Sequence, residues 1–414
     1  MAQITLTEQQ DCANFFTTAI LVNVTYWHSN PAVQSLDVEI LDQEREGLIR
    51  AIRFGLRVDE AWPTVCQLIE TLSPYMERRG YWAVWEQLLD QALNLARQRD
   101  DMARGVVFSL LLARLLQRQS KIKETIRYYR QTMKLARRTG DRYNRGRACT
   151  NLAYLYIGQG RWQRAERLCY CALSIFEQEN NLHGLAHTEN HLGILYLQLG
   201  QWVETKSVWS KALPHLERAC QYWQTRDDTH GLVYGTMNLG MYYLLVKQPQ
   251  QSIEFSEKAL KCADQVGERL LTGSILVNMG LAYQIAQDYH KAEMYCLRAE
   301  KIFQQFYNLY ELANAQKNLG AIFLEQQKLD KASHYLHSAL SHWHKLDNKY
   351  QIAETQLYLC ECELATNAYQ KAKRWLNQAE AILLEEATLS HRVKTHLDKT
   401  RCSLKQVAAT RQTS

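Results

Sequence analysis

The chain has 414 residues, of which 46% are hydrophobic and 22% are charged, with a formal net charge of +6 at pH 7. This length suits two or three globular domains or one long repeat array, and the scarcity of proline favours a mostly helical fold. The 11 cysteines include no C-x-x-C pair, which excludes the usual zinc and redox spacings and favours reduced thiols in a cytoplasmic protein. No signal peptide is expected in MAQITLTEQQ, and no membrane span in GVVFSLLLARLL, which Arg114 interrupts.

Residues 1–64 are expected to form a helical N-terminal cap. The TEQQ stretch at residues 7–10 fits a capping box and predicts a helix that runs to about His28. The sequence SNP then interrupts the helical pattern, because the residue before a proline disfavours helical geometry. A second helix is predicted over residues 36–57.

From residue 65 onward the sequence repeats itself. NLAYLYIGQGRW at residues 151–162 matches HLGILYLQLGQW at residues 191–202, forty positions later. With one longer step of 47, the same register gives eight anchor positions: Thr71, Leu111, Asn151, His191, Asn238, Asn278, Asn318 and Tyr358. A small residue follows each anchor by two places, and a large side chain follows by five places in all copies but the last. This pattern predicts closely packed helix pairs that bury their apolar faces only by stacking.

The seven extra residues of the long step are expected within residues 211–231. They would add about two turns to the second helix of the fourth repeat, which would protrude and carry Tyr222 and Trp223. These two aromatic side chains would either pack on the next repeat or form an exposed surface for a partner. After the repeats, which end at residue 388, the sequence predicts a capping helix over residues 389–405 and a frayed tail over residues 406–414.

The spacing of Leu152, Tyr156, Gly160 and Trp162, followed by alanines at 165 and 172, resembles the tetratricopeptide repeat in its 40-residue variety. The resemblance covers residues 65–388 and implies an all-α, right-handed solenoid of about eight helix pairs with helical caps. The N-terminal part, with Glu44 before Gly47-Leu48-Ile49, also resembles the entry into the sensor arms of bacterial signal-transduction ATPases with numerous domains. The sequence contains no G-x-x-x-x-G-K-[ST] phosphate loop, so such an arm would act on an effector in trans.

No catalytic motif accompanies the repeats, so neither enzyme activity nor a cofactor is expected. His183, His187 and His191 stand four residues apart on one predicted helix, and this spacing can chelate a metal ion. Because no carboxylate or cysteine stands nearby at a matching spacing, we interpret these histidines as polar groove residues and expect no metal.

Positive charge is concentrated between Arg97 and Tyr170, where 18 Lys and Arg outnumber five Asp and Glu. Five of these cations follow one another at helical spacing and form a stripe, the basic dock: Lys123, Arg127, Arg130, Lys134 and Arg137. The stripe is either a solvated helix face or a docking surface for an acidic protein or a nucleic acid. No recognised nucleic-acid-binding module accompanies it.

Asparagine recurs at the anchor position, as Asn151, Asn238, Asn278 and Asn318. The resemblance implies that these side chains line a concave groove, where each amide can both donate to and accept from the backbone of an extended peptide. Selectivity would come from Arg147, Tyr154 and His187 beside these asparagines, and His191 would face the same groove. Alternatively, the asparagines bond between adjacent repeats and only stabilise the stack.

Together these features favour a non-catalytic, cytoplasmic scaffold or regulatory adaptor that holds a protein or peptide partner in its groove. One alternative is a receptor that binds a signalling peptide, changes its superhelical pitch and so regulates transcription or an enzyme. A second alternative is a basic, nucleic-acid-associated subunit of a larger complex. No membrane partner is expected.

Overall fold

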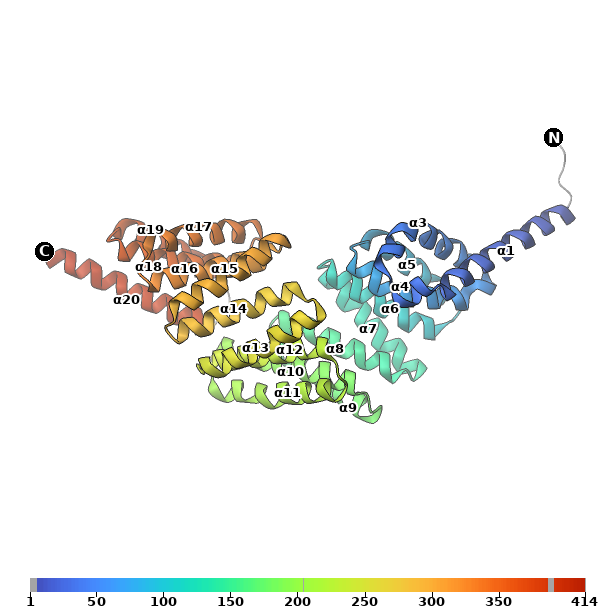
Figure 1. Cartoon of the computed structure of the whole chain (residues 1–414), viewed down its shortest axis with the longest axis horizontal. Helices are drawn as coiled ribbons and strands as arrows, with labels where there is room; N and C mark the ends of the chain where they lie inside the picture. The colour runs from blue at the N-terminus through green and yellow to red at the C-terminus, as the bar shows by residue number, and fades with distance from the viewer. Residues whose placement is uncertain (1–5, 204, 386–390, 414) are drawn as a thin grey trace, which may run out of the picture. The chain divides into compact units, whose positions relative to one another are not determined.

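The computed structural model describes residues 6–203, 205–385 and 391–413, and over these residues the fold is all-α without strands. Twenty α-helices and one short 3-10 helix account for most of the described chain (Figure 1). Their contacts define two compact units. The first unit comprises Met1–Leu152 with Ser174–Glu179, and the second comprises Ala153–Leu173 with Asn180–Ser414.

The first unit starts with elements that lie outside the repeats: α1 (Leu6–Ser29), α2 (Pro31–Ser35), α3 (Val38–Gly55) and the 3-10 helix η1 (Asp59–Ala61). Helix α1 ends at Ser29 and α2 begins at Pro31. The Asn30 side chain caps α2, because its Oδ1 accepts a hydrogen bond from the Ala32 backbone amide. Asp42 of α3 joins this segment to the first repeat, because its Oδ1 accepts hydrogen bonds from the hydroxyls of Tyr75 and Tyr81 at 2.7 and 3.0 Å. The two helices that the sequence predicts here correspond to α1 and α3, whereas the short helices α2 and η1 were not predicted.

The next sixteen helices follow one another as eight pairs, and the predicted all-α solenoid of paired helices is confirmed. In chain order they are α4 (Trp62–Arg78), α5 (Trp82–Gln98), α6 (Met102–Arg118), α7 (Ile122–Thr139), α8 (Arg142–Gly158), α9 (Trp162–Gln178), α10 (Leu182–Val203), α11 (Lys206–Thr225), α12 (Thr229–Leu245), α13 (Pro249–Val266), α14 (Arg269–Ile285), α15 (Tyr289–Gln305), α16 (Leu309–Glu325), α17 (Leu329–Lys345), α18 (Lys349–Ala365) and α19 (Tyr369–Glu385).

Helix starts recur with the repeat because an Asp or Asn caps the first helix of most pairs. The side chain of each capping residue accepts a hydrogen bond from the backbone amide three residues later, which satisfies one of the unpaired N–H groups of the first turn. The six residues that cap in this way are Asp101, Asp141, Asn181, Asp228, Asn308 and Asn348. The start of most pairs is therefore marked by local sequence as well as by packing.

The small residue after each anchor allows the two helices of a pair to approach closely. A Cβ atom added at Gly280 would lie 2.3 Å from Cys296 Sγ, and one at Gly320 would lie 2.6 Å from Leu336 Cγ. The large residue of the pattern then stacks on a ring of the second helix. Three pairs do so twelve positions apart, with ring centroids 5.3 to 5.4 Å apart: Tyr243–Phe255, Tyr283–Tyr295 and Phe323–Tyr335.

The seven extra residues of the fourth repeat lie earlier than the sequence suggests. Tyr196 stacks on His215, nineteen positions later instead of twelve, so the insertion falls between these two residues. It lengthens α10 to 22 residues and α11 to 20, where the regular helices have 17. The expected insertion within residues 211–231 is therefore wrong.

Trp223 does not form an exposed surface either. Its side chain is fully buried, and a Cβ atom added at Gly231 of α12 would lie 2.2 Å from its Cδ1. Tyr222 is partly buried in the same apolar cluster. Of the two interpretations given for these aromatics, packing on the next repeat is correct.

The second unit ends with α20 (His391–Thr413), which contacts α18 and α19 and also α10. Val393 and Leu397 are buried in the core that α20 shares with the last repeat. The helix continues to Thr413, past its expected end at residue 405, while residues 389, 390 and 414 lie outside the described residues. Within the described ranges, no helix is both long and apolar enough to cross a membrane.

Candidate functional site

The anchor asparagines of the second unit are largely buried, with exposed fractions of 9% for Asn238, 5% for Asn278 and 9% for Asn318. The Nδ2 of Asn238 donates a hydrogen bond to Asn190 Oδ1 at 2.8 Å. Asn190 belongs to α10 and Asn238 to α12, so this bond joins the first helices of adjacent repeats. The geometry at Asn238 favours the stack-stabilising interpretation, whereas peptide binding by the asparagines stays a prediction.

Two of the predicted groove residues form an aromatic surface. The Tyr154 ring of α8 stacks on the His191 ring of α10, with 4.9 Å between centroids and 29° between planes. Tyr154 remains 46% exposed, so a partner can reach it.

His187 is enclosed by other rings instead. It packs edge-on against Trp223 and His183, with centroids 5.5 and 4.5 Å away. Burial lowers the pKa of His187 to about 4, with a further contribution from His183, so the ring is neutral at neutral pH. Among the residues that the structure describes, no group of three or more potential metal ligands comes together.

The other two predicted groove residues lie in the first unit. Asn151 lines a cavity of about 340 Å³ between α6, α7 and α8. Arg147 lies one helical turn before it and donates from Nη1 to Asn144 Oδ1 at 3.1 Å. The structure thus brings Arg147 and Asn151 together on α8, and it brings Tyr154 and His191 together in the second unit.

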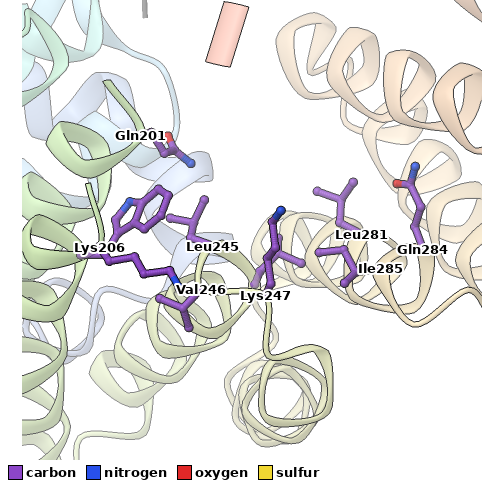
Figure 2. A pocket seen from close by; sticks show the side chains of 10 residues that line it. Gln201, Lys206, Leu245, Val246, Lys247, Leu281, Gln284 and Ile285 are labelled. Atoms are coloured by element: carbon purple, nitrogen blue, oxygen red, sulfur yellow. The ribbon is translucent and has the colours of Figure 1, made fainter. Parts of the chain in front are cut away.

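A larger groove, which the sequence does not predict, lies in the second unit (Figure 2). It encloses about 690 Å³ and is formed by the C-terminal ends of α10, α12 and α14 and the start of α11. Ten residues line it: Gln201, Lys206, Trp209, Leu244, Leu245, Val246, Lys247, Leu281, Gln284 and Ile285. Five of these ten residues are aliphatic and one is a tryptophan, and in Figure 2 Lys247 lies between Leu245 and Leu281.

The insertion in the fourth repeat builds one wall of this groove. Gln201, Lys206 and Trp209 all fall between Tyr196 and His215, the limits of the extra residues. Trp209 packs so closely on α10 that a Cβ atom added at Gly200 would lie 2.1 Å from its Cδ1. The wall is therefore fixed in place by a glycine within the extended helix.

The groove carries positive charge on an apolar surface. Lys206 and Lys247 are both exposed, and none of the ten lining residues is acidic. Gln284 Nε2 donates to Glu325 Oε1 at 2.9 Å, so one lining residue is hydrogen-bonded to a carboxylate of the next repeat. An acidic group on an apolar segment would complement this lining.

The signal for the groove is present in the sequence, six and seven places after the anchor. These positions hold Leu244 and Leu245 in one repeat, and Gln284 and Ile285 in the next. They lie about two turns beyond the anchor on the same helix, where Leu244 is still buried but Leu245, Gln284 and Ile285 are partly or largely exposed. Apolar residues at such positions in consecutive repeats indicate a binding surface as well as a core.

The basic dock lies on α7, the second helix of its pair. All five of its side chains are exposed: Lys123, Arg127, Arg130, Lys134 and Arg137. The guanidinium of Arg127 lies over the Tyr128 ring at 4.8 Å from the centroid. The predicted stripe therefore exists as an exposed surface, and its role in docking stays a prediction.

Comparison with known proteins identifies the repeats. Family models of the tetratricopeptide repeat match residues 146–183, 232–305 and 271–336. A comparison with curated proteins finds no match. The paired helices define a repeat scaffold, and the chain contains tetratricopeptide repeats, as the sequence predicts.

The fold is similar to that of a signal-transduction ATPase with numerous domains (STAND) that carries a tetratricopeptide repeat sensor, from Pyrococcus horikoshii. The TM-score is 0.58 at 15% identity; the match covers 91% of this chain, which spans only 55% of that protein. The apo form of the quorum sensor NprR from B. thuringiensis matches at a TM-score of 0.57 and 15% identity, over 87% of this chain and 97% of that one.

A Rap protein complexed with competence and sporulation factor matches at a TM-score of 0.54 and 14% identity, over 83% of this chain and 98% of that one. At such identities the likeness concerns the fold alone.

Proposed function

We propose that this protein is a non-catalytic, cytoplasmic regulatory adaptor that holds a segment of a protein partner in the groove of the second unit and acts on an effector in trans. The proposal rests on the groove between α10, α12 and α14, in which five of the ten lining residues are aliphatic. The tetratricopeptide fold itself is an interaction scaffold, which agrees with a binding role.

The groove has the chemistry of a peptide-binding surface. Leu245 and Leu281 are partly exposed and Ile285 is 43% exposed, so a partner that covers them removes apolar area from water. Burial of apolar surface is favourable by about 25 cal/mol per Å². Lys206 and Lys247 then favour a segment that carries acidic side chains next to its apolar ones.

The role of the predicted groove residues forms part of the same proposal. Tyr154 and His191 supply an accessible aromatic surface, and stacked rings commonly form the anchors of binding surfaces. The anchor asparagines would contribute through their small exposed fraction, and chiefly by holding the first helices in register.

The proposal is tested by comparing Ile285→Asp with Leu270→Asp. Both residues belong to α14, with similar exposed fractions of 43% and 38%, but only Ile285 lines the groove. Proteins captured from native lysate by the wild-type chain and by each variant would be quantified by mass spectrometry. We expect partners that are lost with Ile285→Asp, retained with Leu270→Asp and weakened by Lys247→Glu. Equal capture by all variants would exclude the groove as the binding surface.

A receptor for a signalling peptide is a second candidate, and the fold shared with the quorum sensor NprR and the Rap protein favours it. In that case occupancy of the groove should change the arrangement of the repeats. Small-angle scattering with and without the captured segment distinguishes the two candidates, because a rigid adaptor would give the same profile in both states.

A further inference from the structure

A separate cavity in the first unit is lined almost entirely by polar side chains. It encloses about 340 Å³, and its lining residues are Arg114, Gln117, Arg118, Tyr129 and Asn151. Arg114, Gln117 and Arg118 come from the last turns of α6, Tyr129 from α7 and Asn151 from α8. Three helices of two repeats therefore direct hydrogen-bonding groups to one small space.

The arginines at this cavity exceed the carboxylates that pair with them. Glu77 is buried, and its Oε2 accepts from Arg114 Nη2 at 3.2 Å and from Arg118 Nε at 3.0 Å. One carboxylate thus serves two guanidinium groups, and each of those groups retains further N–H donors.

A third arginine adds to this excess. Arg147 is partly buried, and its described hydrogen bond is to a neutral amide oxygen, that of Asn144. Burial, and to a lesser extent Arg114, lowers the pKa of Arg147, whereas Tyr143, Tyr129 and the Asp141 carboxylate act to raise it. The charges of Arg114, Arg118, Arg147 and Glu77 sum to +2, and the Asp141 carboxylate near Arg147 reduces this excess to one positive charge.

The neutral residues of the lining can complete an anion site. The Tyr129 hydroxyl donates to Gln117 Oε1 at 2.7 Å, which leaves the NH₂ group of Gln117 as a donor. Tyr129 is also hydrogen-bonded with Asn151. These bonds hold the two amides in place, so that they can contribute donors without ordering on binding.

We propose that this cavity binds a phosphate monoester group, carried either by a phosphorylated side chain of a protein or by a small phosphorylated molecule. A phosphate monoester carries a charge of about −2 at neutral pH, so the excess of positive charge attracts it more strongly than it attracts a single carboxylate. The planar guanidinium groups suit the oxygens of a phosphate, which they can bind with two parallel hydrogen bonds. The site goes beyond the proposed groove function, because it lies in the other unit and shares no residue with the groove.

The proposal is tested on the full chain by ³¹P NMR titration with inorganic phosphate and with the amide of N-acetylphosphoserine, using succinate as a carboxylate competitor. Arg147→Gln removes one cation without exposing a carboxylate, and Arg118→Gln leaves Arg114 paired with Glu77. Arg127→Gln, on the exposed face of α7, is the matched control. We expect saturable binding that weakens at least tenfold in Arg147→Gln and in Arg118→Gln and stays within twofold in Arg127→Gln.

The outcomes separate the sources and can overturn the site. Tighter binding of the phosphoserine amide than of inorganic phosphate supports a phosphorylated protein, and the reverse order supports a small phosphorylated molecule. Equal weakening by Arg147→Gln and Arg127→Gln would show a diffuse attraction to the basic surface, and displacement by equimolar succinate would show a carboxylate site. Either result overturns the proposal.

Circular dichroism melting of each variant shows that any loss of binding occurs in a folded chain. Because groove binding is measured with Ile285→Asp, failure of either proposal leaves the other intact.

Discussion

Lys317 of α16 and Glu354 of α18 form an ion pair across adjacent repeats, with 2.5 Å between Nζ and Oε2, and both side chains are almost fully buried. Lys317 Nζ also donates to Gln351 Oε1 at 2.8 Å. Removal of one member of such a pair leaves an uncompensated buried charge, so Lys317→Met is expected to lower the free energy of unfolding by about 3–5 kcal/mol. Chemical denaturation of the full chain measures this loss.

The double variant Lys317→Met with Glu354→Leu is the control. It removes both charges and fills the space with apolar atoms, and we expect it to recover most of the lost stability. A single variant that costs less than about 1 kcal/mol would mean that water reaches the pair.

Replacing Asn238 by Ala removes the hydrogen bond to Asn190 that joins α10 and α12. We expect the free energy of unfolding to fall by about 1–2 kcal/mol, because Asn190 loses its partner in a buried setting. The combined change of Asn238, Asn278 and Asn318 to Ala then tests the peptide-binding role. If the asparagines grip a peptide, partner affinity falls by about 1–3 kcal/mol while the fold stays helical; if they only stabilise the stack, the melting temperature falls and affinity holds.

Charge reversal in the basic dock tests whether it binds an acidic partner. Arg127→Glu together with Arg130→Glu should weaken such binding most at low salt, because ions screen charges that are exposed to solvent. Lys373→Glu, at an exposed position of α19, is the control. An affinity that is the same for both variants at every salt concentration would identify the stripe as a solvated helix face. Titration with a nucleic acid duplex over the same salt series tests the nucleic-acid alternative.

Stability should depend on pH through His187. Its pKa of about 4 in the folded chain, lowered by burial, lies below the value of about 6.5 for an unfolded histidine. Between these values the unfolded chain binds a proton that the folded chain does not, so stability decreases as the pH falls from about 6.5 towards 4. The urea midpoint at pH 7 and at pH 5 measures the change. His187→Gln should reduce the difference between the two midpoints, whereas the exposed control His337→Gln should leave it as in the wild type.

Tyr307 occupies an unfavourable backbone conformation at the turn between α15 and α16. Its φ is 52° and its side chain is 92% exposed, so no packing compensates for the left-handed geometry. Tyr307→Gly is expected to raise the free energy of unfolding by up to about 1 kcal/mol. Gly267→Ala, at a left-handed glycine with no atom within 4 Å of the added Cβ, should lower it by a similar amount. A destabilised Tyr307→Gly variant would show that the exposed ring has contacts that stabilise this turn.

The sequence predicts the helix pairs well because each pair depends on local columns. The capping residues recur, and small residues such as Gly280 face their partners at a constant separation. The position of the insertion could not be predicted in the same way. Ala212 and Ala219 are seven residues apart, which is about two helical turns, so both fall on the same face and fit the small-residue column equally well. Only the contact of Tyr196 with His215 decides between the two registers.

The candidate site is predicted less well, because sequence periodicity does not separate a covered apolar residue from an uncovered one. Leu245 and Ile285 continue the pattern of their helices, yet the neighbouring elements leave them at a groove. The Asn190–Asn238 bond was likewise hidden, because Asn190 stands one place before the anchor column. The excess of arginine in the first unit was visible, but the convergence of Arg114 and Arg118 with Tyr129 and Asn151 on one cavity depends on how α6, α7 and α8 pack together.

The insertion between Tyr196 and His215 shows how a repetitive chain can acquire an individual surface. On both sides of it the contacts keep one spacing, since Gly146 faces Phe176 and Gly273 faces Phe303, each thirty positions later, so the added length is absorbed within a single repeat. The sequences of the repeats before and after it do not have to change when the fourth repeat changes. A lineage could therefore alter what this chain recognises by varying the positions between Tyr196 and His215, while the other repeats are inherited unchanged.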